Sequence, residues 1–305
     1  MGSRSLLNLG LVALVMALLL VAYFKPGLEP EPGAQPITTQ LDPATVTTLH
    51  IERHNRAPLA FSKDGDLWYL ATSGRRLPAA DFQVRALLRL LRATSLRGYP
   101  ANSLDLAALG LDPPRATLDI DALSVHFGAT DALEQQRYVR IDDTVYLIDD
   151  QYQHLINGEW ANFVSGKLLA TRGPITRLEL PGMTLTYGDD PHWQLEPEQA
   201  TTGAAALQGL IDHWQAAAAL YVRSYTGSES AEHVTLHTRD SDVPLTLQVV
   251  SHAPELILAR PDWGIQYHLT SDMEDSLFTL PEPEPEPAAE TGVTTEPNPN
   301  SSEGH

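Results

Sequence analysis

Few residues of this chain have the types and the spacing that catalysis or metal binding requires. His233 and His237 stand four positions apart, a spacing that brings two metal ligands together on a helix. The surrounding HVTLHT predicts a strand instead, in which the two rings would lie roughly 13 Å apart and could not share an ion. Paired carboxylates at Asp142-Asp143, Asp149-Asp150 and Asp189-Asp190 could serve as acid and base in catalysis. Each pair stands in a turn-like context, so we interpret all three as turn residues.

The chain has no sequence motif of the common enzyme classes. It contains no glycine-rich phosphate loop, no G-x-S-x-G elbow and no H-E-x-x-H. It also contains no cysteine, which excludes disulfides, thiolate metal sites, a cysteine nucleophile and a lipid-modified cysteine. We therefore expect a protein that is not an enzyme and that uses no cofactor and no metal.

A cluster of arginines is the charged feature that departs most from its surroundings. The formal net charge of the chain is -19, which argues against a nucleic-acid partner, because phosphate binding needs a basic surface. One interpretation of the cluster is a solvated surface paired with local carboxylates. The other is a docking surface for an acidic protein partner or for anionic lipid headgroups. The candidate docking residues are Arg75, Arg76, Arg85, Arg89, Arg92 and Arg97.

The N-terminal region predicts a membrane anchor. Residues 6–24 are apolar and uncharged, and a helix of this length, at about 1.5 Å per residue, spans a hydrocarbon core of roughly 30 Å. A cleaved signal peptide is the alternative, but cutting after Ala22 would put Leu20 where a small side chain is required. Because Arg4 precedes the anchor, residues 1–5 are expected in the cytoplasm and the bulk of the chain in the periplasm. The predicted location is the bacterial inner membrane, crossed once.

Two further segments have compositions that do not predict a packed core. Residues 25–43 are rich in proline and should form an extended linker. Residues 281–305 begin with alternating proline and glutamate, which can form neither a helix nor a sheet, so a disordered tail is expected. The folded part should therefore lie between residues 44 and 280.

Residues 44–170 predict a first α+β unit that begins with short strands. Apolar residues at Leu49 and Ile51, and again at Leu59 and Phe61, alternate with polar ones. The Asp-Gly of residues 63–66 predicts a tight turn, because these residue types tolerate positive φ. The next strand, residues 67–70, contains Trp68, which we expect to be buried.

Two helices should follow these strands. Asp81 is expected at the start of the first, as its N-cap or as a first-turn carboxylate. Within it, Val84, Leu87, Leu88 and Leu91 fall at i, i+3, i+4 and i+7, which predicts one apolar face. Ser103 should cap a second, shorter helix, and Gly110 should end it in the left-handed conformation. Four strands are then predicted at 117–120, 123–127, 137–141 and 144–148, with a closing segment at 155–163.

Residues 171–280 repeat this order of elements with little identity. Strand-like runs at 178–180, 185–187 and 193–195 precede a helical stripe of Leu207, Leu210, Ile211 and Trp214. Four more strand-like runs follow at 234–236, 245–249, 256–258 and 265–269, with Tyr267 in the place of Tyr146. We infer two tandem repeats, each a mainly antiparallel sheet with one or two packed helices. Chance similarity between two α+β domains is the alternative. The helix of the second repeat carries no arginine, so only the first repeat would be specialised for contact.

The first unit carries a series of features in a distinctive order. They are Trp68, Ala79 to Asp81, the helix with Val84, Leu87 and Leu88, the turn Leu109-Gly110-Leu111-Asp112-x-Pro114, Tyr138 to Arg140, and Val145, Tyr146, Leu147 and Ile148. In these features, over about residues 45–165, the chain resembles a bacterial family known as domain of unknown function 4340. The resemblance implies an anchored envelope protein, since the genes of this family often stand beside those of ABC-type export components of the gliding-motility class. It implies no catalytic residues.

These observations predict a non-catalytic, membrane-anchored envelope protein that acts by protein contact. The resemblance implies an accessory subunit of an ABC-type export or envelope complex. The alternative function is a periplasmic ligand-binding module that holds a small apolar or glycan ligand between the two repeats. In that case a pocket lined by Trp193, Trp214 or Trp263 is expected.

Overall fold

The computed structural model describes most of the chain between residues 33 and 280. The described ranges are 14–16, 33–38, 41–72, 74–132, 135–188, 190, 192–198, 202–227 and 231–280. Apart from Leu14–Met16, the predicted anchor at 6–24 lies outside these residues, as do most of the predicted linker at 25–43 and the predicted tail at 281–305. In the ranges given, no helix is long and apolar enough to cross a membrane.

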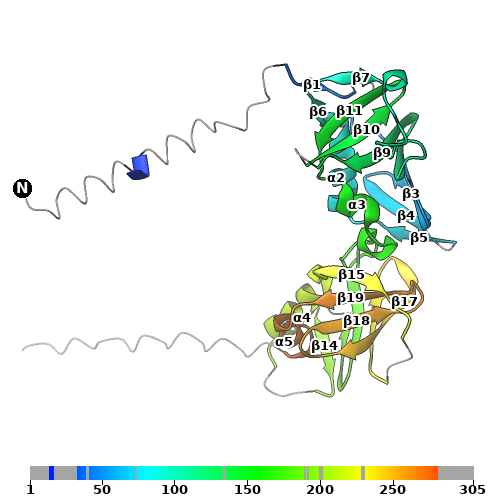
Figure 1. The fold of residues 1–305 in the computed structure, drawn as a ribbon. Coiled ribbons are helices and arrows are strands. Elements are labelled where there is room, and N and C mark those ends of the chain that lie inside the picture. The colour runs from blue at the N-terminus through cyan, green and yellow to red at the C-terminus, as the bar shows by residue number, and fades with distance from the viewer. Residues whose placement is uncertain are drawn as a thin grey trace, which may run out of the picture. The chain divides into compact units, whose positions relative to one another are not determined.

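Two large antiparallel sheets and a few helices make up the described chain, so the α+β class is confirmed (Figure 1). The first sheet has nine strands and takes them from residues 48–149. The second sheet has eight strands and takes them from residues 175–269. A separate two-stranded ribbon pairs β1 (Gln35–Pro36) with β6 (Thr94–Ser95).

Strand register in the first sheet places the apolar residues on one face. Leu49 lies opposite Phe61 and Ile51 lies opposite Leu59, so the predicted alternation is confirmed. Gly65 closes the predicted Asp-Gly turn with a φ of 58°. The strand order is β5-β4-β3-β2-β8-β9-β10-β11-β7. The bounds are β2 (Thr48–Arg53), β3 (Arg56–Asp64), β4 (Leu67–Thr72), β5 (Arg75–Pro78), β7 (Gly98–Pro100), β8 (Ala116–Ile120), β9 (Leu123–Thr130), β10 (Gln136–Ile141) and β11 (Thr144–Asp149).

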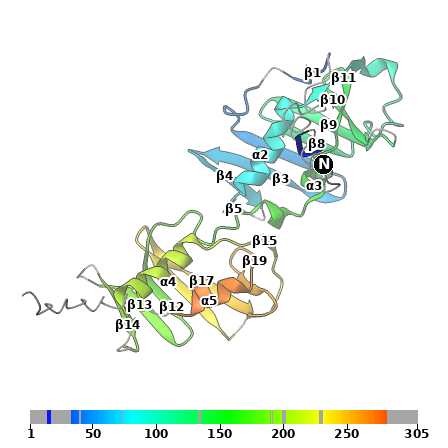
Figure 2. The same ribbon diagram turned by 90° about the vertical axis from the view of Figure 1, so that its left-hand side faces the viewer.

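One helix covers part of the apolar face of this sheet. It begins as α2 (Asp81–Leu88), continues as the 3-10 turn η1 (Arg89–Arg92), and packs against β4 and α3 (Gln153–Asn157) (Figure 2). All four residues of the predicted apolar stripe are buried, with Val84 and Leu87 fully so. The predicted closing segment forms α3 and the 3-10 turn η3 (Trp160–Phe163), and the Phe163 ring packs edge-on against Phe61 at 5.5 Å.

The predicted helix between Ser103 and Gly110 is wrong. A 3-10 turn, η2 (Ala101–Ser103), is followed by an irregular turn. The Ser103 hydroxyl donates a hydrogen bond back to the Pro100 carbonyl oxygen at 2.7 Å, so it does not cap a helix that follows. The Leu111 amide then reaches the Leu106 carbonyl oxygen at 2.8 Å, a wider loop than an α-helical bond closes. Gly110 does adopt the predicted left-handed conformation, with φ of 66°.

The second sheet contains every strand predicted for it. Leu178 lies opposite Leu185 on one neighbouring strand and opposite Leu236 on the other. The order is β14-β13-β12-β16-β17-β18-β19-β15. The strands are β12 (Ile175–Leu180), β13 (Met183–Tyr187), β14 (Trp193–Glu196), β15 (Tyr221–Ser224), β16 (His233–Thr238), β17 (Ser241–Ser251), β18 (Leu256–Arg260) and β19 (Ile265–Leu269), and the helices are α4 (Ala204–Ala216) and α5 (Asp272–Phe278).

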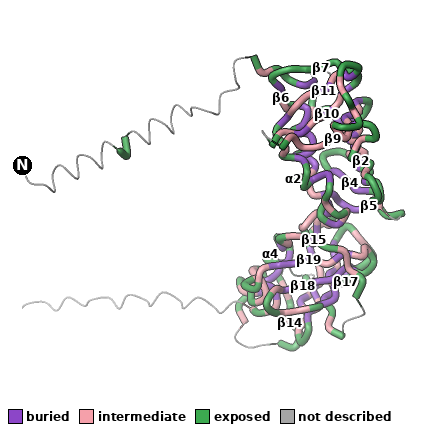
Figure 3. The backbone as a smooth tube through the Cα atoms, in the orientation of Figure 1, coloured by how far each residue is buried: buried purple, intermediate pink, exposed green. Residues whose placement is uncertain are grey.

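The chain follows the same path through both sheets. In each, a run of antiparallel strands leads to a helix. A short strand after that helix then pairs with the strand that comes last in the chain, β7 with β11 and β15 with β19. The four strands that come next in the chain begin beside the first strand, β8 on β2 and β16 on β12. Buried residues line β18 and β19 (Figure 3). Among them is Tyr267, whose pKa burial raises to about 12, whereas Tyr146 is only half-buried.

The C-terminal helix α5 is attached to α4 and to the second sheet by several contacts. Leu277 is fully buried, and the Trp214 indole donates a hydrogen bond to its carbonyl oxygen at 2.7 Å. On the other side His252, just after β17, lies 2.8 Å from a Glu274 carboxylate oxygen. The second ring nitrogen of His252 lies 3.0 Å from Glu232. The His252 imidazole therefore links α5 to the sheet through two carboxylates.

The His252 contacts predict a pH-dependent contribution to stability. The hydrogen bond to Glu232, helped by the charges of Glu232 and Glu274, raises the pKa of His252 above its ordinary value. The contribution is then fully present below pH ~6.5, the ordinary histidine pKa, and is lost as the pH rises through the higher folded-state pKa. His252→Gln should cost about 0.2–1 kcal/mol per ion pair at pH 6, because the partly exposed pairs are screened by solvent, and less at pH 8.

Urea unfolding of both proteins at the two pH values measures this difference. Glu274→Gln serves as the matched variant and should lose part of the same pH dependence. An equal loss of stability at pH 6 and pH 8 would contradict the assignment to the charged imidazole.

Candidate functional site

The outer surface of α2 and η1 carries an exposed stripe of one aromatic and three basic residues. Phe82, Arg85, Arg89 and Arg92 stand at i, i+3, i+7 and i+10, so they share one side of the continuous helix. All four are exposed, and the Phe82 side chain is 67% exposed. The apolar stripe of the same helix faces the sheet and turns these residues outward. We call them the α2 stripe.

Local contacts hold two of these arginines in place without burying them. Arg85 forms an ion pair at 2.5 Å with Asp81, one turn earlier, and both side chains are more than half exposed. Such a pair contributes only about 0.3–0.5 kcal/mol to stability. The Arg89 guanidinium lies 5.8 Å from the centre of the Phe82 ring, within the range of a cation–π contact. These arginines therefore remain accessible to a partner.

A cavity of about 330 Å³ adjoins the end of the α2 stripe. Arg89 and Arg92 line it together with Ile148, Asp149 and Tyr152. Burial raises the pKa of Tyr152, while the positive charge of Arg89 acts in the opposite direction. The phenol consequently stays neutral and able to donate a hydrogen bond.

The other three predicted arginines lie elsewhere on the first sheet. Arg75 and Arg76 belong to the edge strand β5, whereas Arg97 immediately precedes β7, the strand at the opposite edge. Arg76 is 3.0 Å from Asp64, and its guanidinium lies 3.9 Å from the centre of the Tyr69 ring. The six arginines therefore do not form one compact surface, and the α2 stripe is the part that the structure brings together.

The G-L-D-x-P turn anchors the segment before β8 to the core of the first sheet. Leu111 is 1% exposed and packs in one apolar cluster with Ala101 and Val145. It also forms an isolated β-bridge with Pro114, and Asp112 precedes the cis peptide bond to Pro113. Gly128 on β9 has no side chain because the turn leaves no space for one. A Cβ there would collide with the Leu109 carbonyl oxygen, which accepts a hydrogen bond from Ala129 at 2.7 Å.

A buried ion pair supports the same region from β10. The Arg137 guanidinium makes two parallel contacts of 2.8 Å with the carboxylate of Asp150, and the two side chains are 7% and 9% exposed. It also donates to the Gly128 carbonyl oxygen at 2.8 Å, and the Thr130 hydroxyl donates to Asp150 at 2.7 Å. Burial acts to raise the pKa of Asp150, but the hydrogen bonds from Arg137 and Thr130 outweigh it, and the pKa is lowered.

The remaining residues of the predicted motif lie in β4, α2 and β11. Trp68 is buried at 6% exposure, as predicted, and its carbonyl oxygen accepts a hydrogen bond from the Ala79 amide at 2.7 Å. Asp81 lies in the first turn of α2, one residue after the N-cap, and Tyr146 is in β11. The motif residues are therefore distributed over strands, the turn and the start of α2.

The family described as "Domain of unknown function (DUF4340)" matches residues 68–235, more than half of the chain. The chain belongs to this family. In this DUF4340 protein the match begins at Trp68 in β4 and ends in β16, so it starts later than the predicted 45–165, continues past the end of that range and includes α4. No curated protein and no solved structure matches the chain.

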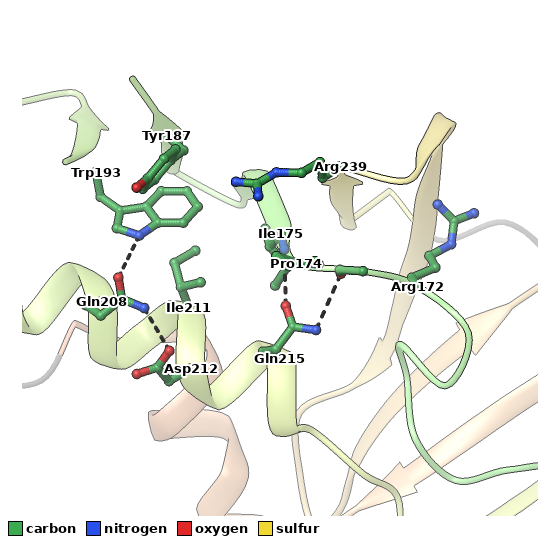
Figure 4. A pocket seen from close by; sticks show the side chains of 11 residues that line it. Arg172, Pro174, Ile175, Tyr187, Trp193, Gln208, Ile211, Asp212, Gln215 and Arg239 are labelled. Atoms are coloured by element: carbon green, nitrogen blue, oxygen red, sulfur yellow. Dashed lines mark hydrogen bonds between the residues drawn. The ribbon is translucent and has the colours of Figure 1, made fainter. Parts of the chain in front are cut away.

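A second cavity of this DUF4340 protein lies on the second sheet, beside α4, with a volume of about 510 Å³ (Figure 4). Trp193 and Tyr187 form one end of it, with ring centres 5.2 Å apart at 65°. The Trp193 indole donates to Gln208 at 3.0 Å, and the Gln208 amide donates to Asp212 at 2.8 Å. Arg239, in the turn after β16, lies on the side opposite α4 (Figure 4).

Of the three tryptophans that the sequence marked for a ligand pocket, only Trp193 lines this one. Trp214 is fully buried in the core between α4 and α5. Trp263 has the Arg260 guanidinium 3.3 Å from the centre of its ring. Sequence reasoning did not single out Gln208, Asp212 and Gln215 as a group, although their i, i+4, i+7 spacing places them on one side of α4.

The histidine pair lies on a strand, as predicted. His233 and His237 are both in β16, and His237 is 3.8 Å from Glu179 of β12. In the part of the chain that the structure describes, no group of three or more His, Asp or Glu side chains has an arrangement that could hold a metal ion.

Proposed function

We propose that this protein is a non-catalytic, membrane-anchored envelope protein that acts by protein contact through the α2 stripe. Its partner would be an acidic surface of another subunit in an ABC-type export or envelope complex, which is the role that the family resemblance implies. The anchor at 6–24 would cross the inner membrane and leave both sheets in the periplasm. The two sheets would be copies of one unit, a relation that their common chain path supports.

The observation that carries the proposal is the composition and exposure of the α2 stripe. Arginine and aromatic residues are the types most enriched at the energetic centres of protein interfaces. The stripe presents three arginines beside an exposed phenyl ring, on a chain with a net charge of -19. A partner with carboxylates would find bidentate donors there, and burying Phe82 would add apolar area. In the second sheet, the corresponding helix α4 carries no arginine.

Reversing the charge of the stripe tests the proposal. The triple variant Arg85→Glu, Arg89→Glu, Arg92→Glu should weaken partner binding by about 100-fold or more, because each new carboxylate would repel an acidic surface. The full chain would be crosslinked in intact membranes and purified, and co-purifying transport or envelope subunits would be measured. Thermal unfolding should change little, because all three side chains are exposed.

The other three predicted docking arginines provide a matched control. Arg75→Glu, Arg76→Glu, Arg97→Glu changes the net charge by the same amount but lies outside the stripe, and should retain the partner. Loss of the partner in both variants would indicate a nonspecific charge effect. If no transport or envelope subunit is recovered with the unmodified chain, the proposed role fails.

A further inference from the structure

The cavity beside α4 combines an apolar wall with a row of polar groups. Ile211 and the half-buried indole of Trp193 provide the wall, which Tyr187 extends. The polar row consists of Gln208, Asp212 and Gln215, which also line the cavity and are all exposed. An apolar ligand would leave the remaining donors and acceptors of the polar row without partners. A ligand with an apolar face and a hydroxylated edge, as a sugar ring has, would use both.

Hydrogen bonds within the cavity fix the polar row and leave part of it available. Gln208 is held between Trp193 and Asp212, and Gln215 accepts a hydrogen bond from the Ile175 amide at 3.1 Å. Within the residues that the structure describes, the second carboxylate oxygen of Asp212 has no hydrogen-bond partner. The row therefore presents amide donors and carboxylate acceptors in fixed positions, and hydroxyl groups, which both donate and accept, fit such a row.

Arg239 adds a positive charge that points into this space. In Figure 4 its guanidinium extends above Ile175 toward Tyr187 and Trp193, whereas Arg172 points away from them. Arg172 donates to the Val243 carbonyl oxygen at 2.7 Å. No such bond holds the Arg239 guanidinium among the described residues, and its side chain is exposed. A free, forked donor of this kind matches a carboxylate or a phosphate.

We propose that this cavity binds a sugar unit that carries an anionic group. The ring would lie against Trp193 and Ile211, its hydroxyls would bond to the α4 row, and its anion would meet Arg239. The volume of about 510 Å³ falls within the range of roughly 300–1,000 Å³ that small-molecule sites occupy. The site is separate from the α2 stripe and does not depend on it.

Calorimetric titration of the full chain in detergent tests the proposal with four probes, which are glucuronic acid, glucose 1-phosphate, glucose and inorganic phosphate. At least one charged sugar should bind about tenfold or more tightly than glucose and than inorganic phosphate, because the site needs both ring and charge. The tighter of the two charged sugars identifies the anion as carboxylate or phosphate. Glucose or inorganic phosphate binding as tightly as both charged sugars, or no sugar binding, overturns the proposal.

Two arginine variants provide a matched pair. Arg239→Ala should weaken binding of the charged sugar about tenfold or more and leave glucose binding unchanged, because only the anion contacts Arg239. Arg172 lines the same cavity, but its guanidinium points away from Tyr187 and Trp193. Arg172→Ala should therefore leave both affinities within about twofold. Equal losses in the two variants overturn the assignment. Both residues contribute through exposed or half-exposed side chains, so folding should survive. Reversal of the α2 stripe should not change sugar binding.

Discussion

Replacement of Arg137 by alanine is expected to lower the free energy of unfolding by about 3–5 kcal/mol. The side chain of Asp150 is only 9% exposed, and the substitution removes the Arg137 guanidinium that pairs with it. The Gly128 carbonyl oxygen also loses a hydrogen-bond donor. A buried charge without its partner is costly because the carboxylate has lost its hydration, and the hydrogen bond from Thr130 does not replace the guanidinium charge. Urea unfolding monitored by circular dichroism measures the loss.

The matched control for Arg137 is Arg85→Ala, which removes an exposed ion pair and should cost no more than about 0.5 kcal/mol. The double variant Arg137→Met, Asp150→Leu removes both charges and should recover much of the stability that the single change loses. The pKa of Asp150 is lowered in the folded state, so its contribution is present above the ordinary pKa of about 3.9 and is lost as the pH falls through the folded-state value. A loss of less than about 1 kcal/mol for Arg137→Ala would contradict the expectation.

Replacement of Trp214 by alanine is the second change with a large expected effect, about 3–5 kcal/mol. The indole is fully buried, packs edge-on against Phe278 at 5.8 Å, and is the donor to the Leu277 carbonyl oxygen. Removing it leaves a cavity and a buried carbonyl without its bond, both at the contact between α4 and α5. We therefore expect α5 to lose protection from amide hydrogen exchange in addition to the global loss.

Trp214→Phe separates packing from hydrogen bonding. The phenyl ring fills much of the cavity but cannot donate to Leu277, so a smaller loss, of roughly 1–3 kcal/mol, is expected. Trp193→Phe is the matched surface change, because Trp193 is only half-buried, and it should cost less than Trp214→Phe. Unchanged exchange rates in α5 for Trp214→Ala would show that the helix is held mainly by other contacts.

Much of the strand pattern was predictable from apolar periodicity, and the physical reason is visible in the register. The pairs Leu49 with Phe61 and Leu178 with Leu236 lie on faces that must be buried, so alternation specifies them. The short strands β5, β7 and β15 were not predicted, because three or four residues give too few repeats of a period of two. The helix expected after Ser103 does not form, and the Ser103 hydroxyl bonds backward to Pro100 instead of capping it.

The candidate sites were only partly predictable. The α2 stripe was visible as arginines on the polar side of a helix, but their separation from Arg75, Arg76 and Arg97 depends on which strands form the two edges of the sheet. Asp150 was interpreted as a turn residue, because nothing local reveals that Arg137 on the neighbouring strand reaches it. Arg239 likewise could not be predicted to line the cavity beside α4. It does so because β16 pairs with β12, which brings the turn after β16 to this cavity.

The strand order also sets the sequence of events during synthesis of the chain. The pairing of Leu49 with Ile120 joins segments far apart in the chain, so β2 keeps an open edge until β8 has been made. Such non-local pairing slows folding and leaves that edge exposed to other chains in the interval. The first sheet is complete once Asp149 has emerged, before β12 begins at Ile175. A growing chain can therefore pair β2 with β8 before β12 is made. The open edges of β2 and β12 then need not be exposed to other chains at the same time, which lowers the chance of aggregation.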